Sequence, residues 1–377
     1  MPDSQILIVA GEVSGDIHAG NMLAELRRLR SGVRAFGVGG ERLVAAGLDP
    51  LASIDELAHM GLVEVLRELP RIRRLMHHLV EEASRRRPSL AILVDSPDFN
   101  LRLASRLRPL GVPVVLYVSP QLWAWRRGRV RTVRRLAREV LCLLPFEVPF
   151  YENHGVPARY VGHPLVDEIA RVGLLSRASD VIEGRLALLP GSREMEVSQL
   201  LPVMMETLRE LPSTEVSEAV LVEAPGMREI ADSVLAAAGS DPRLIRVRGE
   251  ERRLELARSA AAWTASGTAT LECALLDVPM IVGYRLRGLT YAVARLLVDV
   301  SNVALVNLIA GKTIAPELLQ NDWRPDRLAR ATSNLLRSGG QKQRAELSVV
   351  RRRLGHQGAS QNAAEAVLEH LDASGIG

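Results

Sequence analysis

Leu186-Ala-Leu-Leu-Pro-Gly-Ser-Arg193 runs from an apolar strand pattern through a glycine turn into a helix pattern. Ala265-Ser-Gly-Thr-Ala-Thr-Leu-Glu272 has the same order later in the chain. Backbone N–H groups at the start of such a helix can hold phosphate, because they lack partners within the helix. A third stretch with this order, Ile6-Leu-Ile-Val-Ala-Gly-Glu-Val-Ser-Gly-Asp16, lies near the N-terminus. These stretches predict two nucleotide-type α/β units with a site in the cleft between them.

Apolar runs of strand length alternate with helix patterns in both halves of the chain. Continuous Val/Ile/Leu runs between helices are typical of parallel strands that are buried on both faces. The predicted fold class is therefore α/β, with two Rossmann-like doubly wound domains facing a cleft and C-terminal helices packing back. The predicted strands are residues 5–10, 35–38, 90–95, 113–118 and 140–144 in the first half, and 186–189, 219–223, 245–247, 261–265 and 280–283 in the second.

The domain boundary is expected where strand patterns fade and proline, glycine and polar residues gather, between Gly162 and Gly184. A chain of 377 residues is long for one hydrophobic core and suffices for two. The tail has two helix patterns divided at residues 355–358, and we expect it to pack on the N-terminal domain or on a partner subunit. The predicted parts are an N-terminal domain at 1–165, a linker at 166–184, a C-terminal domain at 185–340 and the tail at 341–377.

Composition narrows the class of protein. The 47% hydrophobic content favours folded domains over disorder. The formal charge is only +4, and no nucleic-acid-binding motif accompanies the arginines, so we expect no nucleic-acid partner. The N-terminus lacks the pattern of a secretory signal, and charged residues interrupt the apolar stretch 289–310. These features predict a cytoplasmic protein without a membrane-spanning helix.

A candidate catalytic base lies in Leu93-Val-Asp-Ser-Pro-Asp-Phe-Asn100. Proline fits the first helical position there, which places Asp98 in the first turn, where a carboxylate favours the positive end of the helix. Asp95 has no such structural reason. It ends an apolar strand at the expected ligand edge, where burial can raise its pKa toward that of a useful base. We therefore predict Asp95, not Asp98, as the base.

The turn after the first strand adds further candidates. Glu12 follows that strand at its carboxyl end, which is the usual ligand edge of a parallel sheet. Ser14 or Asp16 can cap the next helix, so a purely structural role explains Ser14 equally well. We expect Glu12 and Ser14 to assist Asp95 or to shape its surroundings. The spacing of the glycines does not match a dinucleotide-binding motif.

Aromatic and basic residues gather after the strand at 113–118. Trp123 and Trp125 admit two interpretations, simple packing or, with Arg126 and Arg127, a patch that grips an anionic lipidic ligand. The helix pattern at 62–80 is likewise open, since it has one apolar face and several arginines. It fits a core-facing helix with a solvated basic side, or a helix at a membrane surface.

The two turns of the second half supply candidate phosphate-binding groups. In the first, the amides of Gly191 and Ser192 can approach a diphosphate while Arg193 neutralises it. The second offers the same service at a helix N-terminus, and Glu272 one turn later could accept hydrogen bonds from ribose hydroxyls. No D-x-D carboxylate pair is present, so we expect no bound metal and no other cofactor. The second turn contributes Ser266, Gly267 and Thr268.

Short motifs spread from Ile6 to about Gln320 carry a resemblance to a known family. The last fifty or so residues are recognisable mainly as helices. The matching segments are 10–16, 60–65, 95–100, 117–125, 143–147, 161–164, 188–193, 265–272, 279–284 and 305–310.

Together these motifs resemble the lipid-A-disaccharide synthases, a family of bacterial glycosyltransferases. The resemblance implies the GT-B architecture, with an N-terminal acceptor-binding domain and a C-terminal domain that holds the UDP-sugar. It implies an inverting transfer between UDP-2,3-diacylglucosamine and 2,3-diacylglucosamine 1-phosphate (lipid X), which yields lipid A disaccharide 1-phosphate and UDP. Both substrates carry acyl chains, so peripheral association with the inner membrane is implied, and we expect a homodimer.

The resemblance also implies roles for particular residues. The family's catalytic base corresponds to Asp95, in agreement with the structural argument. The arginine of its P-G-S-R motif corresponds to Arg193. Its asparagine in the N-L-x-A stretch lands on Asn307, which is implied to contact the UDP-sugar. Val306 departs from the family pattern, since many members have proline at this position, and the backbone before Asn307 is therefore less constrained.

Two rival functions follow from the same features. Another UDP-sugar enzyme of this architecture, such as a UDP-N-acetylglucosamine epimerase or a peptidoglycan glycosyltransferase, would keep the phosphate turns of the second half. It would not have D-S-P-D-F-N together with S-P-x-x-W-A-W. A non-catalytic nucleotide binder at a membrane surface would bind UDP and tolerate loss of Asp95, because it has no turnover.

Overall fold

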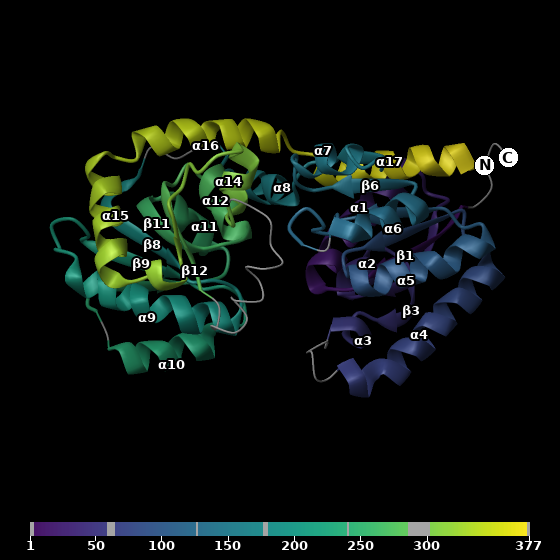
Figure 1. The fold of residues 1–377 in the computed structure, drawn as a ribbon, viewed down its shortest axis with the longest axis horizontal. Helices are drawn as coiled ribbons and strands as arrows, with labels where there is room; N and C mark the ends of the chain where they lie inside the picture. Colours follow the sequence, from purple (N-terminus) through teal and green to yellow (C-terminus); the bar gives the residue numbers. More distant parts are fainter. Residues whose placement is uncertain are drawn as a thin grey trace. The chain divides into compact units, whose positions relative to one another are not determined.

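The computed structural model describes residues 4–58, 65–125, 127–175, 180–239, 241–285 and 302–374. The chain divides into two compact units (Figure 1). The first unit comprises residues 1–164 and 356–377, and the second comprises residues 165–355.

The first unit is built on a parallel seven-stranded sheet with the order β3-β2-β1-β4-β5-β6-β7. Side chains alternate between the two faces along β1, so that Leu7 and Val9 join one core while Ile6 and Ile8 join the other. The strands are β1 (Gln5–Ala10), β2 (Arg34–Gly39), β3 (Leu48–Ser53), β4 (Leu90–Val94), β5 (Val114–Tyr117), β6 (Glu139–Cys142) and β7 (Ala158–Tyr160).

Helices cover both faces of this sheet, as Figure 1 shows. The core on one face includes α4, α5 and α6, and the core on the other includes α1, α2 and α17. The helices of the unit are α1 (Val13–Leu29), α2 (Glu41–Ala45), α3 (Asp55–Ala58), α4 (Val65–Arg86), α5 (Pro97–Leu107), α6 (Val130–Leu136), α7 (Glu147–Glu152) and α17 (Ala359–Ser374), with short 3-10 turns η1 (Arg108–Leu110) and η2 (Arg127–Arg129).

The second unit has a parallel six-stranded sheet with the order β10-β9-β8-β11-β12-β13. Helices α9, α10 and α15 share a core with one face of the sheet, while α12, α14 and α16 pack on one another. The strands are β8 (Ile182–Leu189), β9 (Glu218–Val222), β10 (Leu244–Val247), β11 (Ser259–Ala265), β12 (Met280–Tyr284) and β13 (Glu317–Leu319). The helices are α8 (Pro164–Arg171), α9 (Glu194–Glu210), α10 (Arg228–Ala238), α11 (Glu251–Ala257), α12 (Thr268–Leu275), α14 (Leu305–Ala310), α15 (Pro325–Arg337) and α16 (Gln341–Leu354), with the 3-10 turn η3 (Gln320–Asp322).

The predicted fold class is confirmed, and each of the ten predicted strands is present with ends shifted by a few residues. Three strands were not predicted, namely β3, β7 and β13, and all three lie at sheet edges. An edge strand is covered less completely, so it does not need a continuous apolar run. The sequence of β3 even contains Pro50, which an edge tolerates because one side of the strand forms no ladder.

The tail divides between the two units. Helix α17 packs against α1 in the first unit, whereas α16 packs against α12 and α14 in the second. The expected linker at 166–184 starts with most of α8, and the residues of α8 from Leu165 onward belong to the second unit.

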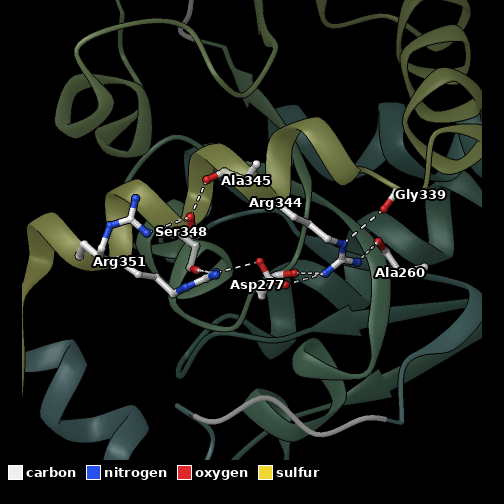
Figure 2. A network of polar contacts seen from close by, with 9 residues as sticks. Ala260, Asp277, Gly339, Arg344, Ala345, Ser348 and Arg351 are labelled. Carbon is white, nitrogen blue, oxygen red and sulfur yellow. Dashed lines mark hydrogen bonds and ion pairs between the residues drawn. The ribbon is translucent and has the colours of Figure 1, made fainter.

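Two arginines of α16, Arg344 and Arg351, form hydrogen bonds with the segment at the end of α12 in the second unit (Figure 2). Asp277 follows α12 with φ +58° and accepts hydrogen bonds from Arg344 and Arg351. Arg351 also donates to the carbonyl of Ala274 at 3.0 Å, and Arg344 donates to the carbonyl of Asp277. Cations at the carboxyl end of a helix satisfy carbonyls that lack partners within the helix. This network explains why α16 stays with the second unit.

Helix α4 resolves part of the question raised by the 62–80 pattern. Leu75, Met76 and Leu79 are buried in the core, while Arg73 and Arg74 are exposed. The core-facing interpretation is therefore confirmed for this part of the helix. Residues 62–64 lie outside the described part of the chain, and the apolar side chains at 75–79 are not at the surface.

Candidate functional site

The predicted base lies in a strained turn between β4 and α5. Asp95 and Ser96 both have left-handed backbone conformations, with φ +54° and +40°. Such conformations cost free energy in residues other than glycine and persist where the surroundings enforce them. The buried amide of Asn100 does so here, because its Nδ2 donates to the carbonyl of Val94 at 3.0 Å and to that of Asp95 at 2.8 Å.

Burial sets the electrostatics of Asp95. Loss of solvent raises the pKa of its carboxyl group, and the hydrogen bond from the Ser96 amide, 2.9 Å from Oδ1, lowers it in part. A carboxylate with a raised pKa is a stronger base than an ordinary aspartate. It is ionised only when the pH is above that raised pKa. The arrangement suits proton abstraction from a substrate hydroxyl.

The turn after β1 lies directly beside the Asp95 turn. A Cβ on Gly11 would come within 2.1 Å of the Cβ of Ser96, and one on Gly15 within 3.6 Å of the Cβ of Asp95. Glu12 precedes α1, Ser14 lies in its first turn, and both are exposed. The structure therefore brings the turns that carry all three predicted catalytic residues to one edge of the sheet.

Asp16 does not cap its own helix. Its carboxylate accepts hydrogen bonds from the amides of Gly40, Arg42 and Leu43 at 2.7–3.1 Å, and so caps the start of α2. The expectation that Ser14 or Asp16 caps α1 was therefore wrong for Asp16, and the residue before α1, Glu12, makes no side-chain cap. The long-range contact could not be inferred from local spacing.

The loop after β5 that carries Trp123 and Trp125, here called the tryptophan loop, is held by side chains of α7. Trp123 is 9% exposed, and its indole donates to the carboxylate of Glu147 at 3.1 Å. The hydroxyl of Tyr151 donates to the carbonyl of Pro120 at 2.7 Å, and Val118 at the start of the loop has φ +63°. The packing interpretation therefore describes Trp123 better than a surface patch does.

The rest of the predicted patch is exposed where it is described. Trp125 is 38% exposed, and Arg127 is exposed while donating to the carbonyl of Trp123 at 3.4 Å. Arg126 lies outside the described residues. Trp125 and Arg127 are thus the described members that a lipidic ligand could reach.

Glu147 predicts a specific pH dependence of stability. Burial raises the pKa of its carboxyl group from 4.5 to about 7, and hydrogen bonds including those from Leu144 and Trp123 offset part of that effect. Below pH 4.5 the group is protonated in both the folded and unfolded states. Between pH 4.5 and 7 the unfolded chain releases the proton while the folded chain keeps it, so the free energy of unfolding falls by about 3 kcal/mol.

We therefore expect Glu147→Gln to remove this pH dependence. Thermal unfolding of the parent and the variant at pH 5 and pH 8 measures it. The difference between the two proteins should change with pH by roughly 3 kcal/mol, since titration of all other groups cancels. A difference that stays constant over this range would contradict the assignment of a protonated Glu147 at pH 5.

The first phosphate turn of the second unit follows β8. Gly191 has φ +121°, and a Cβ there would come within 2.4 Å of the Glu196 carboxylate. That carboxylate accepts a hydrogen bond from the amide of Ser192 at 3.0 Å and forms an ion pair with Arg193 at 3.0 Å. The turn thus already holds a negative charge of the protein itself. Arg193 is well exposed, with 77% of its side chain accessible.

The second phosphate turn follows β11, the neighbour of β8 in the sheet. Gly267 has φ +150° and precedes α12, and the Ser266 hydroxyl donates to the carbonyl of Val303 at 2.9 Å. Thr268, the first residue of α12, is exposed. Because β8 and β11 are parallel neighbours, the two phosphate turns lie at the same edge of the sheet.

Glu272 is held by arginines of α11. Its carboxylate forms ion pairs with Arg253 at 2.7 Å and Arg252 at 3.7 Å, and it is 9% exposed. Arg253 also pairs with Glu168 of α8. A contact to ribose hydroxyls would have to be made beside these ion pairs.

Asn307 is fully buried and fully hydrogen-bonded within the chain. Its Nδ2 donates to the carbonyl of Ala315 at 2.9 Å and to the Glu317 carboxylate at 2.7 Å. Its Oδ1 accepts from the amides of Ile314 and Ala315 at 2.8 and 2.9 Å. An asparagine amide has two donors and two acceptor positions, and all four are used here. The geometry gives Asn307 a structural role between α14 and β13.

Two absences apply to the described part of the chain. There, no group of three or more His, Cys, Asp or Glu side chains is arranged to hold a metal ion. Within the same ranges, no helix combines the length and the apolar character needed to cross a membrane.

Three acidic or amide side chains that shape the site were not predicted from the sequence. Asn100 holds the Asp95 turn, Glu147 holds the tryptophan loop, and Glu196 occupies the first phosphate turn. Glu196 had a local signal, since a glutamate three residues after the residue preceding a helix is typical of a capping box. Asn100 and Glu147 lie in the matching segments 95–100 and 143–147, but no local pattern indicated which groups they contact.

Comparisons with known proteins agree over nearly the whole chain. The model of the family described as lipid-A-disaccharide synthetase matches residues 6–371. The lipid-A-disaccharide synthase of Anaeromyxobacter sp. (strain K) is 47% identical over 376 residues, with 97% of each chain covered. That of Myxococcus xanthus (strain DK1622) is 45% identical over 381 residues, again with 97% of each chain covered.

Solved structures share the fold at low sequence identity. A UDP-GlcNAc 2-epimerase from Neisseria meningitidis, bound to UDP-GlcNAc, aligns with a TM-score of 0.64 at 11% identity, covering 97% of this chain and 100% of that one. The kitacinnamycin glycosyltransferase aligns with a TM-score of 0.64 at 17% identity, covering 98% and 100%. These similarities show the fold alone. The match over residues 6–371 and relatives above 40% identity show that the chain belongs to the lipid-A-disaccharide synthetase family.

Proposed function

We propose that this protein is an inverting glycosyltransferase that joins UDP-2,3-diacylglucosamine to 2,3-diacylglucosamine 1-phosphate and releases UDP. The family membership supports the choice of substrates. The observation that carries the mechanism is the half-buried Asp95 in its strained turn, with a pKa raised by the loss of solvent around it. The rival epimerase activity has only the fold in its favour, because the similar epimerase structure is 11% identical.

In the proposed mechanism Asp95 takes the proton of the acceptor's 6-hydroxyl. The oxygen attacks the anomeric carbon of the donor as the bond from that carbon to the UDP oxygen breaks, and the α-linked donor becomes a β-1′,6-linked product. The proton remains on the Asp95 carboxyl, and the electron pair leaves with UDP. One displacement with one base accounts for inversion.

The second unit is proposed to hold the UDP portion. Arg193 and the amides of Gly191 and Ser192 neutralise the diphosphate, with Ser266, Gly267 and Thr268 at the neighbouring turn. Preorganised donors at a leaving group lower the barrier, because they stabilise charge that develops in the transition state. Glu272 is proposed to accept hydrogen bonds from the ribose.

We also propose metal-independent turnover, peripheral association with the inner-membrane surface on the cytoplasmic side, and a homodimer. The acyl chains of both substrates favour a membrane location, and the exposed Trp125 and Arg127 are candidate contacts. The candidate patch also includes Arg126. Trp123 is proposed to support these contacts indirectly, because it fixes the shape of the tryptophan loop that carries Trp125.

The reaction is tested directly with the purified protein, both substrates in detergent and EDTA in the buffer. We expect UDP release that depends on the acceptor, and a tetraacyl disaccharide product in the mass spectrum. UDP binding without product would redirect the search to other UDP-sugars. Strict dependence on a divalent metal would overturn the metal-free mechanism.

Arg193→Ala is expected to weaken UDP binding about tenfold or more, because charge-assisted hydrogen bonds to phosphate are among the strong ones. The variant should fold normally, since Arg193 is exposed and its ion pair spans only three residues. Arg228→Ala is the matched control, as Arg228 is an exposed arginine of the same unit paired with Asp232. Titration calorimetry with UDP measures both. Equal affinities in the two variants would remove Arg193 from the site.

A further inference from the structure

A groove of about 400 Å³ lies between α5 and α6 in the first unit. Its apolar part includes Leu101, which is buried, and Leu136, which is partly buried. Arginines from both sides line the rest. They are Arg102 and Arg106 of α5, Arg129 of the turn before α6, and Arg135 of α6.

The charge of this groove is strongly positive. Among the described residues that line it, Asp98 is the only acidic one, and its carboxylate pairs with Arg129 at 2.5 Å. The remaining three arginines, at positions 102, 106 and 135, are exposed. Positive charges gathered along low-dielectric walls raise the local concentration of anions. Guanidinium groups bind phosphate and carboxylate in a planar two-point geometry, and of these two anions the proposed acceptor contains only phosphate.

The position of the groove links it to the proposed base. Pro97, the first residue of α5, lines the groove and follows Asp95 by two residues. One end of the groove therefore lies next to the turn that carries Asp95. The combination of apolar lining and arginines fits a ligand that has both a phosphate and hydrocarbon.

We infer that the α5–α6 groove binds the 1-phosphate of the acceptor lipid, with adjoining hydrocarbon against Leu101 and Leu136. The inference rests on the proposed function, since it concerns the acceptor of that reaction. Phosphate groups of bulk phospholipids share this chemistry, so the test must separate the two sources. Arg129 is shared with Asp98, whereas Arg102 and Arg106 project from one helix and make the cleaner pair to change.

The experiment measures equilibrium binding of the acceptor to the full-length protein in detergent, without donor. The matched ligand is 2,3-diacylglucosamine, which lacks the phosphate. The variant Arg102→Ala/Arg106→Ala should weaken binding of the phosphorylated lipid about tenfold or more and leave the unphosphorylated lipid unchanged. The control Arg131→Ala, an exposed arginine of α6 outside the groove lining, should keep the parent affinity for both. Unchanged affinity, or an equal loss for both lipids, would overturn the inference.

Three further outcomes distinguish this inference from membrane binding and from the proposed reaction. If the double variant loses binding to vesicles of anionic phospholipid but keeps its acceptor affinity, the groove serves membrane headgroups and the inference fails. If the parent makes no disaccharide while the phosphate-dependent difference in binding persists, the proposed reaction fails and the groove assignment stands. If disaccharide forms and the double variant has the parent acceptor KM, the groove assignment fails and the reaction stands.

Discussion

Asp95→Asn is expected to reduce kcat by about 100- to 10,000-fold, the range that a positioned general base contributes. Asparagine has nearly the same shape and cannot take a proton, so the strained turn should be preserved by the two hydrogen bonds from Asn100. UDP affinity should stay at the parent value, because the phosphate turns belong to the other unit. Steady-state turnover and UDP titration together measure the two effects.

The same assignment predicts the acidic side of the pH profile. Burial raises the pKa of Asp95, and the base must be unprotonated to act. The kcat/KM value should therefore fall as the pH drops through that raised pKa, at a higher pH than an ordinary aspartate would give. Asp98→Asn is the matched control for kcat, since Asp98 is an exposed aspartate in the first turn of α5, three residues after Asp95. Near-normal turnover in Asp95→Asn, or a collapse in Asp98→Asn alone, would contradict the choice of base.

The central strands of both sheets were predictable because each must be apolar on both faces. The fully buried runs of β1, β4 and β8 leave only one interpretation at that length. The edge strand β13 has only the three residues Glu-Leu-Leu, and its pairing with β12 depends on a segment more than thirty residues away in sequence. Local patterns contain no information on such pairing.

The site was predictable to the extent that chemistry follows strand ends. Asp95 could be chosen over Asp98 because Asp98, the other acidic residue of that stretch, had a local structural reason at the start of the helix. The supports of the site were not predictable, since they are contacts between segments far apart in sequence. Glu147 meets Trp123 across 24 residues, and Asp16 caps a helix that starts 25 residues later.

Asn307 is a motif position where the structure adds contacts within the chain to the role that the resemblance implies. The family pattern suggests a contact with the UDP-sugar, and the structure shows an amide whose four hydrogen bonds are all made within the chain. Glu317 adds to this arrangement, because its carboxylate also accepts from the amides of Val303 and Ala304 before α14. The residue therefore joins the start of α14 to the strand that closes the sheet.

Asn307→Ala is accordingly expected to destabilise the protein by about 4 kcal/mol, since each buried group left without a partner costs about 1–3 kcal/mol. For a unit of this size the unfolding temperature should fall by roughly 10 °C. Asn321→Ala, at an exposed asparagine of the same unit, is the control and should stay within about 0.5 kcal/mol of the parent. UDP affinity, measured well below the lowered unfolding temperature, should change less than threefold or so, because all four bonds of Asn307 are made within the chain. A variant with parent stability and lost UDP affinity would instead establish Asn307 as a direct ligand of the nucleotide.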